Sequence, residues 1–338
     1  MTGPPGLMLV TPQMAAGDCV DALSDVLRLV RLTGAVFLDA EFTAPWCISA
    51  PSGVEVCTRH MPQAQHVVVY HLVTVGDCKV VFADGAAHTA QTGDLIVIPG
   101  GGAHLIGCDL AAPHADLSRL MLQSGSDEVP RVSHGGGGAV TRLVCGYLAC
   151  DSALFKTLLA ALPRLMIVGM RDDPRGQWLA SSLQFSLAEY AAPHAGASTV
   201  LAKLSELMFV EAIRRHIESL PPGQQGWLAG LRDRFVGKAL SLMHSRPAHA
   251  WTVDELASHV GLSRSALAER FAAVIGQPPM QYLTQWRLQI AADLLHNTRR
   301  AIAVIAADVG YDSEAAFSRA FKRELGAAPA TWRRARLA

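Results

Sequence analysis

The sequence predicts an α+β protein of several domains: an antiparallel β-barrel, then a helical dimerisation segment, then an all-α domain with two helix-turn-helix units. Three observations predict this fold class. Short β-rich runs fill residues 35–150, apolar residues recur at helical spacing between residues 178 and 220, and one helical segment near the C-terminus occurs twice. With 338 residues, half of them hydrophobic, the chain exceeds one ordinary core of about 100 to 200 residues.

The first predicted domain is rich in β-strands. Four runs are typical of strands, at residues 67–75, 78–83, 94–98 and 142–148, and Gly, Pro and Asp separate them. Short strands of this kind close into an antiparallel barrel or pack as a sandwich, and we expect a barrel over residues 18–150.

A change to helical spacing between residues 178 and 220 predicts two amphipathic helices, and the helical dimerisation segment that holds them is expected over residues 151–218. Their apolar stripe consists of Leu179, Leu183, Leu187, Leu201, Leu204, Leu207, Met208 and Ala212. Such a stripe either packs onto the barrel or meets the same stripe of a second subunit, and we favour a homodimer. The Pro- and Gly-rich residues 221–226 predict a linker over residues 219–230.

The charge of the chain is balanced overall but uneven along its length. Residues 1–229 hold 14 basic and 20 acidic side chains, a net charge of −6, whereas residues 230–338 hold 15 and 9, a net charge of +6. Basic side chains favour a polyanionic partner because they neutralise phosphates and release counterions. Residues 231–338 are therefore the candidate nucleic-acid-binding domain.

This domain contains an internal repeat. Residues 253–261 match residues 302–310, with Ala257 on Ala306 and Gly261 on Gly310, and after one extra residue Ser263 matches Ser313. Each copy reads as a short helix, a glycine turn, a serine that caps the next helix, and a second helix with basic residues, which is a helix-turn-helix. In the first copy, residues 252–255 also predict a capping box between a threonine and a glutamate.

A helix from residue 279 to about residue 297 joins the two units. Its apolar stripe consists of Met280, Leu283, Trp286, Ile290 and Leu294, and we expect Arg287 to be a structural ion-pair partner. About 18 residues at 1.5 Å each give a rod of roughly 27 Å. Successive major-groove faces on one side of B-DNA lie roughly 34 Å apart, so two recognition helices can read adjacent grooves of double-stranded DNA.

Residues 231–338 resemble the DNA-binding domain of the AraC/XylS family of transcriptional regulators. The motifs that carry the resemblance include residues 251–257 (WTVDELA), 261–265 (GLSRS), 279–283 (PMQYL) and 317–321 (FSRAF), with Gly326 and Pro329 closing the second unit. The resemblance implies a sequence-specific DNA-binding regulator, an activator rather than a repressor, with RNA polymerase as a further partner.

By that resemblance, the first recognition helix begins at Ser263 and the second at Ser313. In the first, Arg264 is the expected base reader, because an arginine fork can bind both acceptors of a guanine. In the second, Arg319, Lys322 and Arg323 are better placed for phosphates. The full set of expected DNA contacts is Ser263, Arg264, Ser265, Ala268, Ser313, Glu314, Ser318, Arg319, Lys322 and Arg323.

The N-terminal region has the spacing of a cupin motif. Gly93, Pro99, Gly101 and His104 stand in the order Gly, five residues, Pro, one residue, Gly, two residues, His, and residues 18–205 resemble the cupin-type regulatory domain of one AraC subgroup. The resemblance implies an unidentified small-molecule effector, and Trp46, His71 and His104 are the expected pocket residues.

No cofactor is expected, because the first cupin motif lacks most of its metal ligands: of residues 62–69, only His66 is a histidine, and it is out of step. Two alternative roles remain for His71 and His104: they could be metal ligands, or they could be buried core histidines without a ligand. The alternative function is a cupin metalloenzyme, an oxygenase or isomerase, fused to a DNA-binding domain.

The cysteines and the apolar runs favour a cytoplasmic protein. Seven cysteines, an odd number without CxxC spacing, predict reduced thiols rather than disulfides. Cys145 matches a position common in the subgroup, but Ala40 stands where the reactive-chlorine sensors have their reactive cysteine. Apolar runs stay below the roughly 18 to 20 residues of a membrane span, and residues 1–13 do not resemble a secretory signal.

Overall fold

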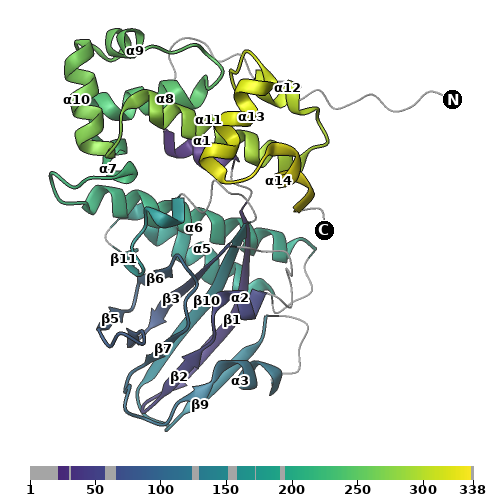
Figure 1. The fold of residues 1–338 in the computed structure, drawn as a ribbon. Helices are drawn as coiled ribbons and strands as arrows, with labels where there is room; N and C mark the ends of the chain where they lie inside the picture. Colours follow the sequence, from purple (N-terminus) through teal and green to yellow (C-terminus); the bar gives the residue numbers. More distant parts are fainter. Residues whose placement is uncertain are drawn as a thin grey trace.

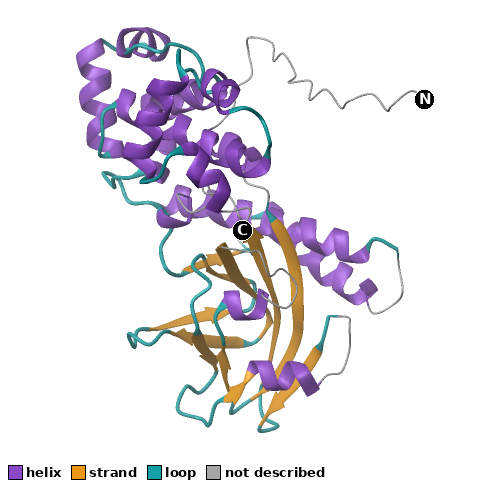
Figure 2. Ribbon diagram, turned by 45° about the vertical axis from the view of Figure 1, so that its right-hand side comes forward, coloured by secondary structure: helices purple, strands orange, loops and turns teal. Residues whose placement is uncertain are grey.

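The structure, a computed structural model, describes residues 22–29, 32–57, 66–123, 129–150, 158–171, 173–190 and 195–335. Figure 1 shows the β-sheets at one end of the molecule and the C-terminal helices at the other. Helices α5 (Pro174–Tyr190) and α6 (Ala197–Ser219) lie between them. The turned view in Figure 2 shows the same separation of strands from helices.

The strands form two sheets. One has the order β11-β6-β3-β10-β1-β9 and the other the order β5-β4-β7-β2-β8. The strands are β1 (Thr33–Thr43), β2 (Cys47–Ala50), β3 (His66–Val75), β4 (Asp77–Val81), β5 (Ala87–Gln91), β6 (Asp94–Ile98), β7 (His104–Gly107), β8 (Ala115–Asp116), β9 (Arg131–Gly135), β10 (Val140–Cys150) and β11 (Met166–Gly169). Two short helices, α2 (Gly53–Cys57) and α3 (Leu117–Gln123), connect them.

The four predicted strand runs are confirmed, but the prediction of a closed antiparallel barrel is wrong in two respects. The described strands belong to two separate sheets rather than one closed sheet, and two pairs, β1 with β9 and β2 with β8, are parallel. Alternation along a strand fixes which face is buried, whereas closure depends on strand number and stagger, which the sequence pattern does not encode.

Both faces of the six-stranded sheet are buried. On β10, Leu143, Cys145 and Tyr147 face the core between the two sheets, while Val144 and Leu148 belong to the core shared with α5 and α6. The same alternation on β3 explains why residues 66–75 read as one continuous apolar run rather than as an alternating one.

Helices α5 and α6 confirm the predicted helical pair, and their apolar stripe packs within this chain. Leu183 and Ala212 are fully buried in the core that α5 and α6 form with the six-stranded sheet, whereas Leu207 is 47% exposed. Of the two partners that the sequence left open, the β-domain is the one that covers the stripe. The buried members of this stripe are therefore not available to a second subunit.

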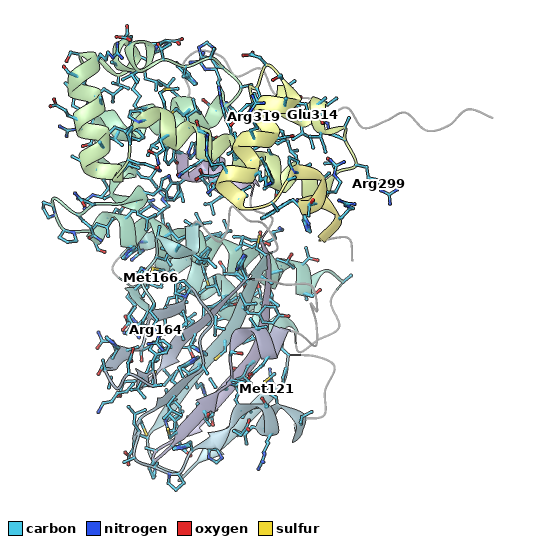
Figure 3. The ribbon with its side chains drawn as sticks, in the orientation of Figure 1. Met121, Arg164, Met166, Arg299, Glu314 and Arg319 are labelled. Carbon is cyan, nitrogen blue, oxygen red and sulfur yellow. The ribbon has the colours of Figure 1, made fainter. Side chains whose placement is uncertain are left out.

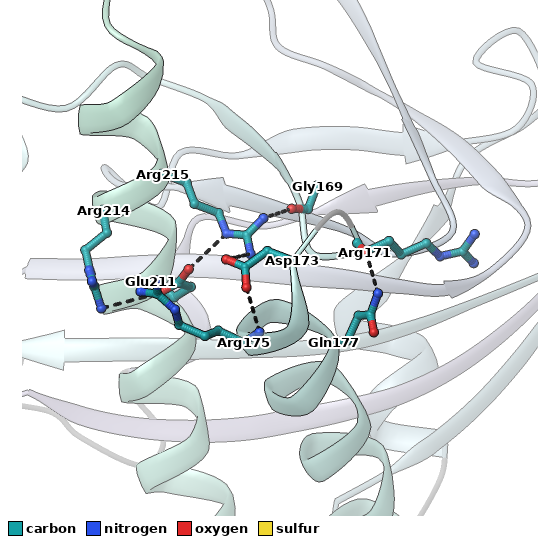
Figure 4. A network of polar contacts seen from close by, with 8 residues as sticks. All are labelled: Gly169, Arg171, Asp173, Arg175, Gln177, Glu211, Arg214 and Arg215. Atoms are coloured by element: carbon teal, nitrogen blue, oxygen red, sulfur yellow. Dashed lines mark hydrogen bonds and ion pairs between the residues drawn. The ribbon is translucent and has the colours of Figure 1, made fainter.

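A buried polar network holds α6 against the segment before α5 (Figure 4). The Arg215 guanidinium donates to Glu211 at 3.0 Å, to Asp173 at 3.0 Å and to the Gly169 carbonyl oxygen. Its side chain is 14% exposed and that of Glu211 is 8% exposed. One side chain thus joins the end of β11, the residue before α5 and the C-terminal half of α6.

The C-terminal helices form two small cores around a shared helix. They are α7 (Trp227–Arg232), α8 (Arg234–Ser245), α9 (Val253–Val260), α10 (Arg264–Ile275), α11 (Pro279–Asn297), α12 (Ile302–Asp308), α13 (Glu314–Leu325) and α14 (Pro329–Ala335). Leu283 near the start of α11 belongs to the first core, with Phe271. Leu288 and Leu295 further along α11 belong to the second core, with Phe317.

Helix α1 (Ala22–Leu29) lies among the C-terminal helices, an arrangement that the sequence did not predict (Figure 1). It packs on α8, and Ala22 belongs to the core of the first helix-turn-helix unit. Leu23 and Val26 belong to the large core of the regulatory domain. Among the described helices, none has the length and hydropathy needed to cross a membrane.

Candidate nucleic-acid interface

The first helix-turn-helix unit consists of α9 and α10. The Thr252 hydroxyl accepts from the Glu255 amide at 3.1 Å and begins α9, and the Ser263 hydroxyl accepts from the Ala266 amide at 3.3 Å and begins α10. Between them Gly261 has φ +83°, a left-handed conformation that L side chains resist. The predicted capping box is only half formed, because the Glu255 carboxylate contacts His249 Nε2 at 2.7 Å instead.

The second unit repeats this geometry in α12 and α13. The Tyr311 amide donates to the Ala306 carbonyl at 2.9 Å, as the Leu262 amide does to the Ala257 carbonyl at 2.9 Å. The Ser313 hydroxyl accepts from the Ala316 amide at 3.2 Å and begins α13. The repeat in the sequence is therefore a repeat of hydrogen bonds, and both predicted recognition helices are confirmed as helices.

Helix α11 is the predicted spacer between the units. Its 19 residues give a length of about 28 Å. The predicted apolar stripe is only partly buried: Leu283 and Trp286 are buried, but Ile290 and Leu294 are half-buried, while Leu288, Ala291, Ala292 and Leu295 are buried instead. The difference arises because α11 packs against both units, so its apolar surface extends beyond one stripe.

Arg287 on α11 joins the two units, but not as the predicted ion-pair partner. Its guanidinium donates to the backbone carbonyls of Pro247 at 2.6 Å and His249 at 2.7 Å, which precede α9. It also donates to the Gly310 carbonyl at 3.3 Å, in the turn of the second unit. Partial burial lowers the pKa of Arg287. The arginine therefore fixes the two units relative to the spacer.

Most of the predicted DNA contacts are exposed on the recognition helices. Ser263, Arg264 and Ser265 are exposed at the start of α10, and Ala268 is half-buried. On α13, Ser313 and Glu314 are exposed and Ser318 is half-buried, while Arg319, Lys322 and Arg323 are exposed further along. Figure 3 labels Glu314 and Arg319 at the end of the molecule farthest from the sheets.

One neighbour of the predicted base reader was missed by the sequence analysis. The Arg264 guanidinium lies 3.3 Å from the Asp254 carboxylate on α9, with both side chains more than half exposed. An exposed pair of this kind contributes little to stability, so Arg264 can exchange the carboxylate for a base edge at little cost. Asp254 lies in the first turn of α9 and Arg264 in the first turn of α10. An acidic and a basic residue in the first turns of the two helices of a helix-turn-helix is the sequence signal that could have predicted this pair.

In the regulatory domain, His71, His104 and Cys145 form one buried chain of hydrogen bonds. His104 Nδ1 lies 2.9 Å from the Gly102 carbonyl oxygen and must donate to it. His104 Nε2 therefore accepts from His71 Nε2 at 3.0 Å, which leaves His71 Nδ1 to accept from the Cys145 thiol at 2.8 Å. Burial lowers the pKa of both imidazoles and raises the pKa of the thiol. The three side chains are therefore bonded in their neutral forms, and the raised pKa of Cys145 disfavours the thiolate form through which a cysteine reacts with oxidants.

The described residues do not fit a cupin metal centre. The two histidines bring two nitrogen atoms together, but a catalytic metal takes about three protein ligands. Within the described part of the chain, no group of three or more His, Cys, Asp and Glu side chains is placed to hold a metal. Residues 62–65 of the first cupin motif lie outside the described residues.

Trp46, the third predicted pocket residue, belongs to the same core between the sheets as Cys145. It is 1% exposed and stacks on Phe42, with the ring centroids 4.4 Å apart. Its indole nitrogen has no hydrogen-bond partner among the described residues. All three predicted effector residues are thus buried inside the β-domain.

Comparisons with known proteins agree with this architecture. Residues 21–218 match the family described as Cupin, and residues 256–335 match the one described as Helix-turn-helix domain. A putative AraC-like transcription regulator of Streptomyces antibioticus is 32% identical over 319 residues, which cover 93% of this chain and 99% of that protein. The HTH-type transcriptional regulator AlkR of Acinetobacter baylyi is 29% identical over 316 residues, covering 93% and 99%. The RCS-specific HTH-type transcriptional activator RclR of Escherichia coli is 27% identical over 315 residues, covering 93% and 97%.

Two helix-turn-helix units on one spacer helix, attached to a cupin domain, define a DNA-binding transcriptional regulator with a ligand-sensing domain. The chain belongs to the AraC family of transcriptional regulators. The relatives that span nearly the whole chain carry the names of regulators, and this favours a regulator over the alternative cupin metalloenzyme.

Proposed function

We propose that this regulator reads two adjacent major grooves, with base contacts at the starts of α10 and α13. The observation that carries the proposal is the repeated geometry of the two units, each with an exposed, serine-capped recognition helix. Arg264 is the base reader of the first unit, and Ser263, Ser265 and Ala268 lie beside it. In the second unit, Ser313, Glu314 and Ser318 face the bases, and Arg319, Lys322 and Arg323 bind phosphates.

Replacing Arg264 with alanine is expected to weaken binding to a selected duplex by about 1 to 3 kcal/mol and to relax preference at one base pair. The physical reason is the loss of a bidentate hydrogen bond from the guanidinium to the two acceptors of a guanine. Competition binding with duplexes substituted at each position measures both effects.

Two variants control for this substitution. Arg119→Ala removes the same charge from the exposed surface of α3 in the regulatory domain and should leave binding unchanged. Lys322→Ala should weaken binding to all sequences alike and lower the salt slope by about 1. Unaltered base preference in Arg264→Ala would remove Arg264 from the readout.

We further propose a homodimer formed through the outer faces of α5 and α6. The inner stripe of these helices is covered, but their outer faces carry four exposed apolar side chains: Trp178 at 60%, Phe185 at 65%, Val200 at 49% and Leu207 at 47%. On each helix the two residues are seven apart and therefore lie on one side. Exposed apolar residues grouped in this way mark protein interfaces, and a second copy of this chain is the occupant that suits a regulator of repeated DNA sites.

Phe185→Lys is expected to raise the dissociation constant of the dimer about 30-fold or more, as for the loss of a central apolar anchor of about 2 kcal/mol. Sedimentation equilibrium at several concentrations measures this shift. Leu122→Lys is the matched control, because Leu122 is 63% exposed on α3, away from this face. A dimer that survives Phe185→Lys as well as it survives Leu122→Lys contradicts the proposed interface.

For the cupin domain we keep Trp46, His71 and His104 as the proposed effector pocket. Their burial and the unpartnered indole nitrogen of Trp46 support the assignment, since an acceptor on a ligand would satisfy that nitrogen. We also propose that the domains divide at residues 150, 218 and 230. The regulator is proposed to activate transcription through contact with RNA polymerase.

A further inference from the structure

A cavity of about 150 Å³ lies between the regulatory domain and the DNA-binding domain. Val26 of α1 and Leu158 line it from the side of the regulatory core. The remaining wall comes from the DNA-binding domain, where Ile275 ends the recognition helix α10 and Trp286 stands on the spacer helix α11. Both domains are needed to form the cavity, and it is separate from Trp46, His71 and His104.

The described lining of this cavity combines apolar and amide groups, and none of the described lining side chains carries a charge. Its polar side chains are Tyr282 and three glutamines, Gln277, Gln285 and Gln289, and its other residues are aliphatic or tryptophan. Gln277 Nε2 donates to Gln285 Oε1 at 2.9 Å. This bond leaves the carbonyl oxygen of Gln277 as an acceptor and the amide nitrogen of Gln285 as a donor.

Trp286 provides a rigid aromatic wall. His244 stacks on it with ring centroids 3.8 Å apart and an interplanar angle of 8°, and His244 Nε2 contacts the Tyr282 hydroxyl at 2.7 Å. The Trp286 side chain is buried, and its indole nitrogen has no hydrogen-bond partner among the described residues. Buried donors normally have partners, so a ligand acceptor that reached this covered nitrogen would supply a hydrogen bond that the described residues do not.

We propose that this interdomain cavity binds a small neutral molecule with one aromatic ring and a carboxamide or similar group, and that its occupation changes the affinity for DNA. A cavity of about 150 Å³ accommodates one benzene-sized ring. The glutamine amides match a group that both donates and accepts hydrogen bonds. A charged ligand is disfavoured because its charge would be desolvated without an opposite charge among the described lining residues.

The position of the cavity provides the link to DNA. A ligand that contacts Val26 and Leu158 on one side and Ile275 and Trp286 on the other stabilises the arrangement in which both domains are in place. It therefore shifts the population of domain arrangements by its difference in affinity for them. The walls it touches are the end of one recognition helix and the spacer that sets the separation of both. This part of the inference rests on the proposed function.

Binding is tested first without DNA, on the full chain, with benzamide as the probe and calorimetry as the measurement. Benzoate has the same ring but a charge, and it is expected to bind about tenfold more weakly or worse. Gln285→Met removes the amide and keeps the length of the side chain, and it should weaken benzamide binding about fivefold. Gln281→Met is the matched control, because Gln281 is exposed on the same helix and is not part of the lining.

Equal binding of benzamide and benzoate, no binding of benzamide, or equal affinities of the two glutamine variants would each overturn the site. The effect on DNA is measured next, by fluorescence anisotropy on a duplex selected from a random library. Saturating benzamide should change the dissociation constant of the native chain for the duplex about threefold or more. The same concentration of benzamide should leave the dissociation constant of Gln285→Met for the duplex unchanged. Benzamide binding without that change would refute the coupling alone. A chain that binds benzamide but no duplex would contradict the proposed DNA readout instead.

Discussion

Replacing Arg215 with methionine is expected to lower the free energy of unfolding by about 3 to 5 kcal/mol. The Arg215 side chain is 14% exposed, and its guanidinium donates to Glu211, Asp173 and the Gly169 carbonyl (Figure 4). Among the described residues, its removal leaves the Glu211 carboxylate, 8% exposed, with Arg214 at 3.8 Å as its one remaining ion-pair partner. A buried charge without a close partner is more costly than the lost ion pair itself, and urea denaturation measures the difference.

Two variants separate the buried charge from other causes. Arg214→Met removes the more distant, half-exposed arginine and should cost less than about 1 kcal/mol. The double variant Glu211→Gln with Arg215→Met removes the unpaired charge and should recover part of the loss. If the double variant is as unstable as the sum of its single variants, the explanation by an uncompensated carboxylate is wrong.

Replacing Arg287 with methionine is expected to cost about 3 kcal/mol of stability, because three backbone carbonyls lose a charged donor. It should also weaken binding to a duplex with two half-sites by about tenfold or more, because Arg287 no longer holds the two helix-turn-helix units in a fixed relative position. Thermal unfolding and anisotropy measure the two effects. Arg287→Lys keeps the charge but not the planar fork, and an intermediate result is expected for it.

The alternative outcome for Arg287→Met is equally clear. If stability falls but the half-site affinity stays at the native value in the folded protein, Arg287 supports each unit separately and does not set their relative position. The variant should then bind single half-sites and paired half-sites with native affinity.

The DNA-binding domain could be predicted in detail because its signals are local. The glycine at 261, the serines at 263 and 313 and the offset between the copies specify turns and caps that depend on a few neighbouring residues. Local chemistry of this kind depends little on the rest of the fold. The predicted starts of α10 and α13 and the predicted extent of α11 therefore agree with the structure within a residue or two.

The sequence could not predict the features that depend on which parts of the protein pack against each other. The spacing of Leu183 and Ala212 predicts an apolar stripe, but the pattern is the same whether a sheet or a second subunit covers it. The same limit applies to α1, which falls within the barrel predicted over residues 18–150 but packs on α8 in the structure. Arg287 was expected to pair with a carboxylate because backbone acceptors leave no mark in a sequence.

The spacing of the two half-sites tests the central claim most directly. Selection from a random duplex library with the full chain should yield two conserved segments centred about 10 bp apart, one for each recognition helix. Inserting about 5 bp between them turns one segment to the opposite side of the duplex and should reduce affinity to that of a single segment. Affinity that is unaffected by the insertion, or a single segment in the selected sequences, would contradict the rigid two-groove arrangement.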